Sequence, residues 1–166
     1  MTFKWHLNKA RAAIALLLAL ATAGQACAGC TASSSGLAFG AYQPLTLPGK
    51  LTSVAVTSSA TVSVTCHLPS GLAGYTLKLG PSLTGNSINP RYMVNSRGGN
   101  NMVFNVYTDA NYSNVWGNGL IGSSISHGLL NGTFAHTVYG RIPAGQNTLK
   151  AGNFSSSLTI TVTYNL

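Results

Sequence analysis

The sequence predicts an all-β domain, a two-sheet sandwich of Greek-key type, and two observations lead to this prediction. Apolar and polar residues alternate with a period of two along several segments, which is the pattern of strands with one buried face. Gly, Pro and Asn cluster between these segments, as in tight turns, and no segment places helix caps around a 3.6-residue stripe. Short, half-buried strands joined by turns are typical of two packed antiparallel sheets.

The expected strands follow one another along the chain with turn-forming residues between them. In chain order they cover residues 36–42, 61–66, 75–79, 102–109, 135–142 and 158–166. The first, fourth and fifth are rich in aromatic and β-branched residues, which favour strands. The other three show the clearest alternation, with Thr, Ser, Lys or Asn at every second position.

Residues 1–28 have the three-part order of a secretory signal peptide. A basic start with Lys4, Lys9 and Arg11 precedes an apolar run over 12–21, and small residues follow up to Ala28. A membrane-spanning helix is the alternative, but the apolar run is about half of the roughly 20 residues that a span requires. We therefore expect cleavage after Ala28, which makes 1–28 a signal peptide and 29–166 one exported domain.

The cysteines are consistent with export and with this cleavage site. Removal of Cys27 with the signal peptide leaves Cys30 and Cys66, the even number expected in an oxidising compartment. The predicted disulfide is therefore Cys30–Cys66. Lipid attachment at Cys27 or Cys30 is the alternative, but neither cysteine has a bulky aliphatic residue three positions before it.

Charged residues are scarce, with nine Lys or Arg and a single acidic residue, Asp109. One carboxylate side chain excludes the paired carboxylates of glycoside hydrolases, two-metal carboxylate sites and EF-hands. The mature chain keeps six basic residues and Asp109, a formal charge of +5, and these basic residues are scattered along the sequence. Scattered basic residues do not predict a nucleic-acid interface. We expect a protein that is not an enzyme and uses no cofactor.

A few polar and aromatic residues have a possible functional interpretation. His67, His127 and His136 with Asp109 could suggest a metal site, but no pair has a ligand spacing such as His-x3-His. A Ser–His136–Asp109 triad lacks the Gly-x-Ser-x-Gly motif, so a hydrolase is the weakest hypothesis. Trp116, in a loop rich in Gly and Asn, is a candidate for contact with a surface or a sugar, with packing over a sheet edge as the alternative.

The last expected strand has no further segment behind it to pair with its backbone or cover its side of the core. A sandwich that lacks a strand has a hydrophobic groove and a row of unpaired backbone groups, which another chain must cover. We expect this groove beside the last strand, lined by the apolar residues of its alternating pattern, Leu158, Ile160, Val162 and Tyr164.

Several short segments occur in one order along the mature chain. They are Cys30 and residues 37–42 (LAFGAY), 62–66 (VSVTC), 91–93 (RYM), 104–109 (FNVYTD), 116–119 (WGNG), 137–146 (TVYGRIPAGQ) and 158–164 (LTITVTY). This ordered set resembles the spore coat protein U domain family, and the resemblance covers essentially the whole mature chain. The family includes subunits of the archaic, Csu-type chaperone–usher pili of Gram-negative bacteria.

The resemblance implies an incomplete immunoglobulin-like pilin that lacks its final strand and receives a donor strand. A periplasmic chaperone would supply this strand first and a neighbouring pilin subunit would supply it later, after passage through an outer-membrane usher. The implied function is structural or adhesive, serving surface adhesion and biofilm formation at the cell surface, in a fimbrium. A self-sufficient secreted β-sandwich that binds carbohydrate or another surface is the alternative.

The chain departs from the family pattern in two places. The family often has Tyr-x-Asp before the last strand, where this chain has Phe154, Ser155 and Ser156, so the contact made by that Asp is not expected here. Polymerising subunits carry a donor segment before the first cysteine, whereas Cys30 follows the expected cleavage site almost at once. We therefore expect a position at an end of the fibre, at its tip.

Overall fold

A computed structural model describes residues 29–67, 74–128 and 132–165, and the predicted signal peptide lies outside these ranges. The described residues form strands and loops without any helix, so none of them belongs to a helix that could cross a membrane. The strands are β1 (Gly29–Ser34), β2 (Val56–His67), β3 (Gly74–Leu79), β4 (Arg91–Asn95), β5 (Met102–Tyr107), β6 (Ile125–Gly128), β7 (Gly132–Ile142), β8 (Phe154–Ser155) and β9 (Ile160–Asn165).

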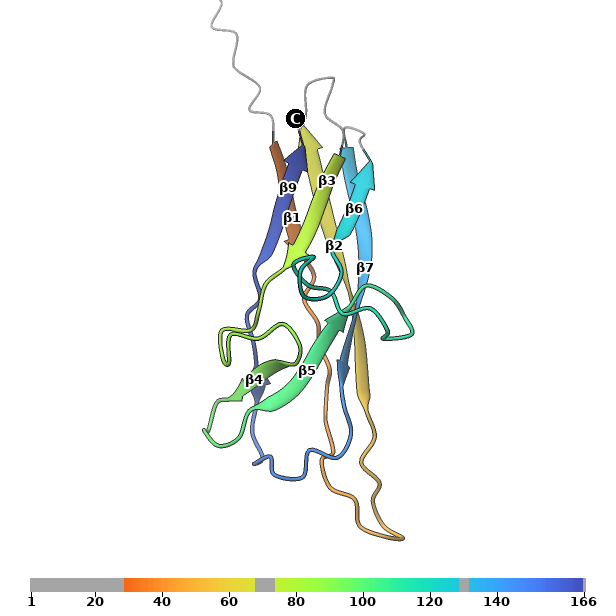
Figure 1. Cartoon of the computed structure of the whole chain (residues 1–166). Coiled ribbons are helices and arrows are strands. Elements are labelled where there is room, and N and C mark those ends of the chain that lie inside the picture. The colour runs from red at the N-terminus through yellow and green to blue at the C-terminus, as the bar shows by residue number, and fades with distance from the viewer. Residues whose placement is uncertain (1–28, 68–73, 129–131, 166) are drawn as a thin grey trace, which may run out of the picture.

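The strands form two antiparallel sheets that pack face to face (Figure 1). One sheet has six strands in the order β1-β2-β7-β5-β4-β8, and the other has three in the order β6-β3-β9. Apolar side chains from both sheets fill the space between them, among them Val62, Val64, Leu77, Val106 and Val138. The prediction of an all-β sandwich is confirmed.

The long pair β2–β7 is the centre of the larger sheet, and its alternating sequence explains why. Ala60, Val62 and Val64 are buried, whereas the intervening Thr61 is exposed and Ser63 is half-buried. This alternation fixes the register, because a shift by one residue would bring hydroxyl groups into the core. The observed register places Val62 opposite His136 and Val64 opposite Phe134.

Five of the expected strands overlap β2, β3, β5, β7 and β9, and the expected strand over 36–42 is wrong. Residues 36–42 are irregular, with Gly36 and Gly40 at φ values of +76° and +71°, which interrupt an extended run. The sequence analysis also missed β1, β4, β6 and β8. These strands are short or rich in small polar residues, so they show little alternation.

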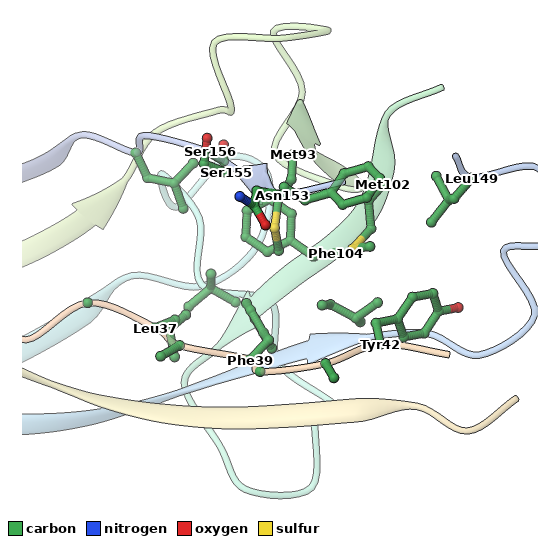
Figure 2. Close-up of a pocket in the computed structure, with 18 of the residues that line it drawn as sticks. Leu37, Phe39, Tyr42, Met93, Met102, Phe104, Leu149, Asn153, Ser155 and Ser156 are labelled. Atoms are coloured by element: carbon green, nitrogen blue, oxygen red, sulfur yellow. The ribbon is translucent and has the colours of Figure 1, made fainter. Parts of the chain in front are cut away.

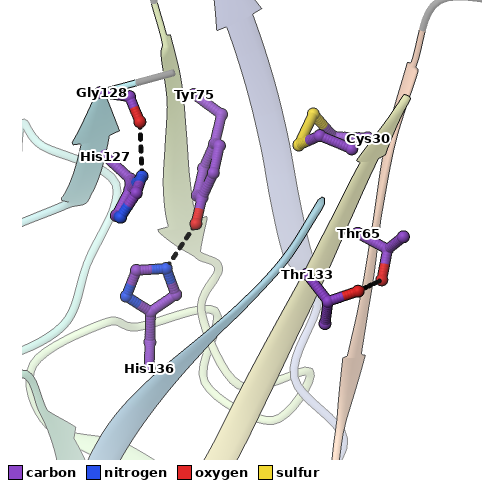
Figure 3. The surroundings of a disulfide bond; sticks show 8 residues. Cys30, Thr65, Tyr75, His127, Gly128, Thr133 and His136 are labelled. Carbon is purple, nitrogen blue, oxygen red and sulfur yellow. Dashed lines mark hydrogen bonds between the residues drawn. A yellow bond between two sulfur atoms is a disulfide. The ribbon is translucent and has the colours of Figure 1, made fainter. Parts of the chain in front are cut away.

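The predicted disulfide Cys30–Cys66 is present, and its two cysteines are direct partners in the β1–β2 register (Figure 3). Cys30 lies inside β1, not before the first strand as expected. Strand β1 also lies against β9 of the smaller sheet. The bridge therefore stabilises the strand that closes the sandwich along this edge.

Arg91 on β4 is fully buried and makes a set of hydrogen bonds that joins several elements. Its guanidinium donates to the carbonyl oxygens of Leu79, Gly80 and Trp116, at 2.8 to 3.1 Å, and to Asn105 Oδ1 at 2.7 Å. Burial lowers the pKa of Arg91 to about 10, so the side chain is still charged at neutral pH. Carbonyl dipoles, not a carboxylate, therefore compensate this buried charge.

Arg91→Lys should lower the free energy of unfolding by about 2–4 kcal/mol, because an ammonium cannot reach all of these carbonyl acceptors and leaves some buried without a donor. Urea unfolding of the exported chain, purified with any partner that it retains, measures the change. Arg97→Lys is the matched control, since Arg97 is exposed, and it should change stability by less than about 0.5 kcal/mol. Equal effects of the two substitutions would contradict this role of Arg91.

Cys30→Ser should destabilise the domain by about 3–4 kcal/mol, the loop-closure value for a bridge between residues 36 positions apart. Thermal or urea unfolding provides the measurement, with the reduced wild-type chain as the control for the substitution itself. Two free thiols found by mass mapping of the exported, non-reduced protein would contradict the structural assignment.

Candidate interaction groove

A groove of about 1120 Å³ opens between the two sheets, away from the edge where β1 meets β9. One wall is the segment 36–45, which follows β1, and the opposite wall is the segment 147–160, which contains β8 and leads into β9. Figure 2 shows Leu37, Phe39 and Tyr42 on one side and Asn153, Ser155 and Ser156 on the other. The sandwich is thus closed along β1 and β9 and open between the segments that extend from them.

The backbone on both walls of the groove lacks hydrogen-bond partners among the described residues. No hydrogen bond to another described residue engages the backbone of 37–42 or of 156–158. The residues on either side of 156–158 do have partners elsewhere in the sandwich. Ser155 opposes Val94 of β4, and the carbonyl of Thr159 accepts a hydrogen bond from the Gly80 N–H. Two stretches of backbone therefore face the same groove with free donors and acceptors.

The floor of the groove is apolar and belongs to the core of the sandwich. It is made by side chains from both sheets and from the loop after β5, namely Ala60, Val62, Leu79, Met93, Met102, Phe104, Val106, Trp116, Val138 and Ile142. All of these side chains are counted among the buried residues of the core. Lys150 is the one charged residue among the described lining residues.

The first wall is held in place by packing and by one tyrosine. Leu37 and Phe39 lie over Gly140 of β7, where an added Cβ would come within 2.6 Å of the Phe39 ring and 2.9 Å of Leu37 Cδ1. The Phe39 ring meets Phe104 edge-on at 6.2 Å. Further along, the Tyr42 hydroxyl donates to the Pro143 carbonyl at 2.8 Å and accepts from the Gln146 N–H. The wall is therefore ordered even though its backbone is unpaired.

The four residues predicted to line the groove divide into two pairs. Leu158 and Ile160 line it. Val162 and Tyr164 are not lining residues: Val162 packs against the core, and Tyr164 is opposite Tyr75 with 37% of its surface exposed. The groove lies beside the segment that leads into β9 and not along β9, because β1 occupies that edge. The sequence did not predict the wall 36–45, because residues 36–42 of it were assigned to an ordinary strand.

Trp116, named as a candidate for surface contact, is not available for it, because the side chain is only 1% exposed. Its indole N–H donates to the Leu77 carbonyl at 3.3 Å, and its backbone carbonyl accepts from Arg91. The Gly- and Asn-rich loop folds this ring into the floor of the groove. Packing, which was the alternative, is what the structure shows.

The polar residues considered for a metal site or a catalytic triad do not gather in one place and have other surroundings. Asp109 accepts from the hydroxyl and N–H of Ser113 and the N–H of Asn114, and the Ser113 hydroxyl is the main reason that the pKa of Asp109 is lowered. His136 is hydrogen-bonded to Tyr75 and His67 is exposed. No group of three or more His, Cys, Asp or Glu side chains in the described ranges could hold a metal ion.

An apolar hairpin, which the sequence analysis did not single out, follows the first wall. Leu47 and Leu51 exchange backbone hydrogen bonds, and Ser53 closes the base by bonds to Thr46 and Gln43. Four aliphatic side chains on this hairpin are 43–58% exposed, namely Leu45, Leu47, Leu51 and Val54. An ordered hairpin with this much exposed apolar surface is a candidate contact site.

Three comparisons with known proteins were made. A chain from a solved structure described as "Chaperone-tip adhesin complex is vital for synergistic activation of CFA/I fimbriae biogenesis" is similar over 74% of this chain and 38% of its own length, with 10% sequence identity and a TM-score of 0.42. This chain thus spans less than half of that one. A comparison with curated proteins found no match. The pattern of the Spore Coat Protein U domain family matches residues 14–161, and the chain therefore belongs to this family.

Proposed function

We propose that the chain is a subunit of a chaperone–usher surface pilus and that its groove receives an extended strand from another chain. The observation that carries this proposal is the pair of unpaired backbone segments, 37–42 and 156–158, that face one apolar groove. Membership of the Spore Coat Protein U domain family supports it, and proteins of this family are structural and not enzymes.

An inserted strand would give hydrogen-bond partners to the backbone of both walls at once. Backbone N–H and C=O groups that leave water need hydrogen-bond partners, and a strand placed between the walls offers them on both of its edges. Its alternate side chains point toward the floor around Phe104, Val106 and Val138. Each fully buried aliphatic side chain stabilises the complex by about 1.5–3 kcal/mol.

The proposal names the partners in the order in which they act. A periplasmic chaperone supplies the strand after export, an outer-membrane usher receives the subunit, and a neighbouring subunit then replaces the chaperone's strand. The protein accordingly passes through the periplasm to the cell surface, where it is part of a fimbrium. The predicted disulfide, now seen between β1 and β2, is consistent with this oxidising route.

Leu158→Asp should abolish a soluble 1:1 complex with the periplasmic chaperone, because it places a charge on the wall that the inserted strand covers. Thr159→Asp is the matched control, since the neighbouring side chain is exposed on the opposite face of the same segment. Co-expression followed by co-purification measures the complex. Thr159→Asp should preserve it, and loss of the complex in both variants would show only that the segment tolerates no charge.

The unpartnered wild-type chain should aggregate or be degraded in the periplasm, because its groove and backbone edges are open. Recovery of a stable, monomeric and soluble chain without a partner would contradict the pilus proposal. It would favour a self-sufficient secreted binding module.

We further propose that the subunit lies at an end of the fibre and that it serves surface adhesion and biofilm formation. The hairpin of Leu45, Leu47, Leu51 and Val54 supports adhesion, because exposed aliphatic side chains on an ordered loop can bury their surface against an apolar material. Trp116, which is buried, has no part in it.

Replacing Leu47 and Leu51 together by Ser should reduce attachment of cells to a hydrophobic surface without loss of pili, because both side chains are exposed and support no core. Leu120→Ser is the control, since Leu120 is 93% exposed on a different loop and should not affect attachment. Crystal-violet staining measures attachment, and immunogold labelling of the subunit counts pili and locates it. Unchanged attachment with normal piliation would contradict the role of the hairpin.

A further inference from the structure

The sandwich contains a cluster of aromatic and histidine side chains between its two sheets, separate from the groove walls (Figure 3). Tyr75 comes from β3, His127 from β6, and His136 and Phe134 from β7. Since β3 and β6 belong to the smaller sheet and β7 to the larger one, these side chains meet across the interface of the sheets.

The contacts within the cluster are close and specific. The Tyr75 hydroxyl lies 2.6 Å from His136 Nε2, and the Tyr75 ring is stacked on His127 with a centroid distance of 5.4 Å. His127 Nδ1 is hydrogen-bonded to the Gly128 carbonyl, and its ring lies 4.4 Å from Phe134. The two imidazole rings are 5.7 Å apart.

We propose that His127, His136 and Tyr75 form an acid-sensitive clasp between the two sheets, closed when both imidazoles are neutral and loosened when they become protonated. This device is independent of the proposed function, because it concerns contacts within one chain. Protonation has two effects. The imidazoles of His127 and His136 become two like charges, and the buried Tyr75 O–H loses its hydrogen-bond acceptor.

Protonation of His136 removes the acceptor for Tyr75. In the neutral tautomer that carries its proton on Nδ1, His136 accepts the phenol O–H at Nε2. A second proton, at Nε2, reverses this bond, so that the ring N–H donates to the Tyr75 oxygen and the phenol O–H is left without its acceptor. Tyr75 is only 2% exposed, so its O–H cannot simply turn to water. A buried donor without an acceptor is costly, which favours separation of β3 from β7.

Protonation of both rings also creates a repulsion that the chain cannot neutralise. Two imidazolium charges at 5.7 Å repel each other, and a carboxylate beside them would normally offset this. Asp109 is the only acidic side chain in the sequence, and its own loop engages it. Among the described residues, the groups around the cluster offer no negative charge: Tyr164 opposes Tyr75 on β9, Val62 opposes His136 on β2, and Lys78 lies on the other face of β3.

The electrostatic environment of His136 gives the direction of the pH dependence. Its pKa is lowered, first by burial and second by the charge of His127. A histidine with a lowered pKa is harder to protonate in the folded state than in the unfolded chain. Its contribution to the stability of the folded state is therefore complete above the ordinary pKa of about 6.5. Stability is then lost as the pH falls from about 6.5 toward the lowered pKa of the folded state.

The cluster is next to the closed end of the groove. His136 lies two positions before Val138 on β7, and it is opposite Val62 on β2, while both valines line the groove floor. Loosening of the clasp therefore acts on the part of the core that the inserted strand would contact.

Urea unfolding of the exported chain, with any partner that it retains, tests the clasp between pH 7.5 and 5. This range avoids the titration of Asp109, whose pKa is lowered from 3.8. The unfolding constant should rise on acidification, by up to tenfold for each unit that separates the folded and unfolded pKa of a histidine. The variant with His127→Gln and His136→Gln should show a much flatter pH dependence. His67→Gln should keep the wild-type dependence, because His67 is exposed at the end of β2.

A measurement on the wild type keeps the proposal testable if the double variant fails to fold. Titration of the histidine ring signals by NMR should give a pKa for His136 below 6.5, and the Tyr75 ring signals should shift in the same pH range. A His136 pKa at or above 6.5, or an unfolding midpoint that does not change between pH 7.5 and 5, would overturn the proposal. The same pH dependence in the double variant would also overturn it.

Discussion

The groove and its proposed partner depend on one requirement, that backbone N–H and C=O groups must have hydrogen-bond partners when they leave water. In this sandwich two stretches of backbone, 37–42 and 156–158, have no such partner among the described residues, and they face each other across an apolar floor. Elsewhere along its edge the sandwich satisfies this requirement, because β1 pairs with β2 and lies against β9. The groove is therefore the place where the proposed strand from another chain would supply these partners.

The rest of the structure keeps this groove open and ordered. The disulfide joins β1 to β2 near the closed edge, and Tyr42 attaches the far end of the first wall to the loop after β7. Arg91 joins the end of β3, the loop that carries Trp116 and strand β5 beneath the floor. These contacts lie around the groove and not across it, which explains how an unfilled core position can persist without collapse.

The sequence predicted the parts of the fold in which one face is buried over several residues. Alternation at Val62, Val64 and Cys66 identified β2, and the same pattern identified β9 and its approach, where Leu158 and Ile160 line the groove. Short strands such as β8, with two residues, carry no period that a sequence pattern can reveal. The segment 36–42 has the composition of a strand but lacks a neighbour, so composition alone gave the wrong assignment.

Other features depended on contacts between distant residues, which spacing does not reveal. Trp116 is buried because Arg91 and Leu77 hold its loop inside the sandwich. His127 and His136 come together because β6 and β7 belong to different sheets that face each other. In both cases the packing of the two sheets determines the position, which the local sequence does not reveal.

Hydrogen–deuterium exchange of the backbone amides in 37–42 and 156–158, measured in the free chain directly after dilution from urea and in the chain bound to its partner, tests the central claim most directly. If another chain inserts a strand, these amides exchange rapidly in the free protein and become strongly protected in the complex, while amides of the exposed hairpin 45–54 are little changed. Rapid exchange of both segments in the complex, or strong protection of both in a free monomer, would contradict the account.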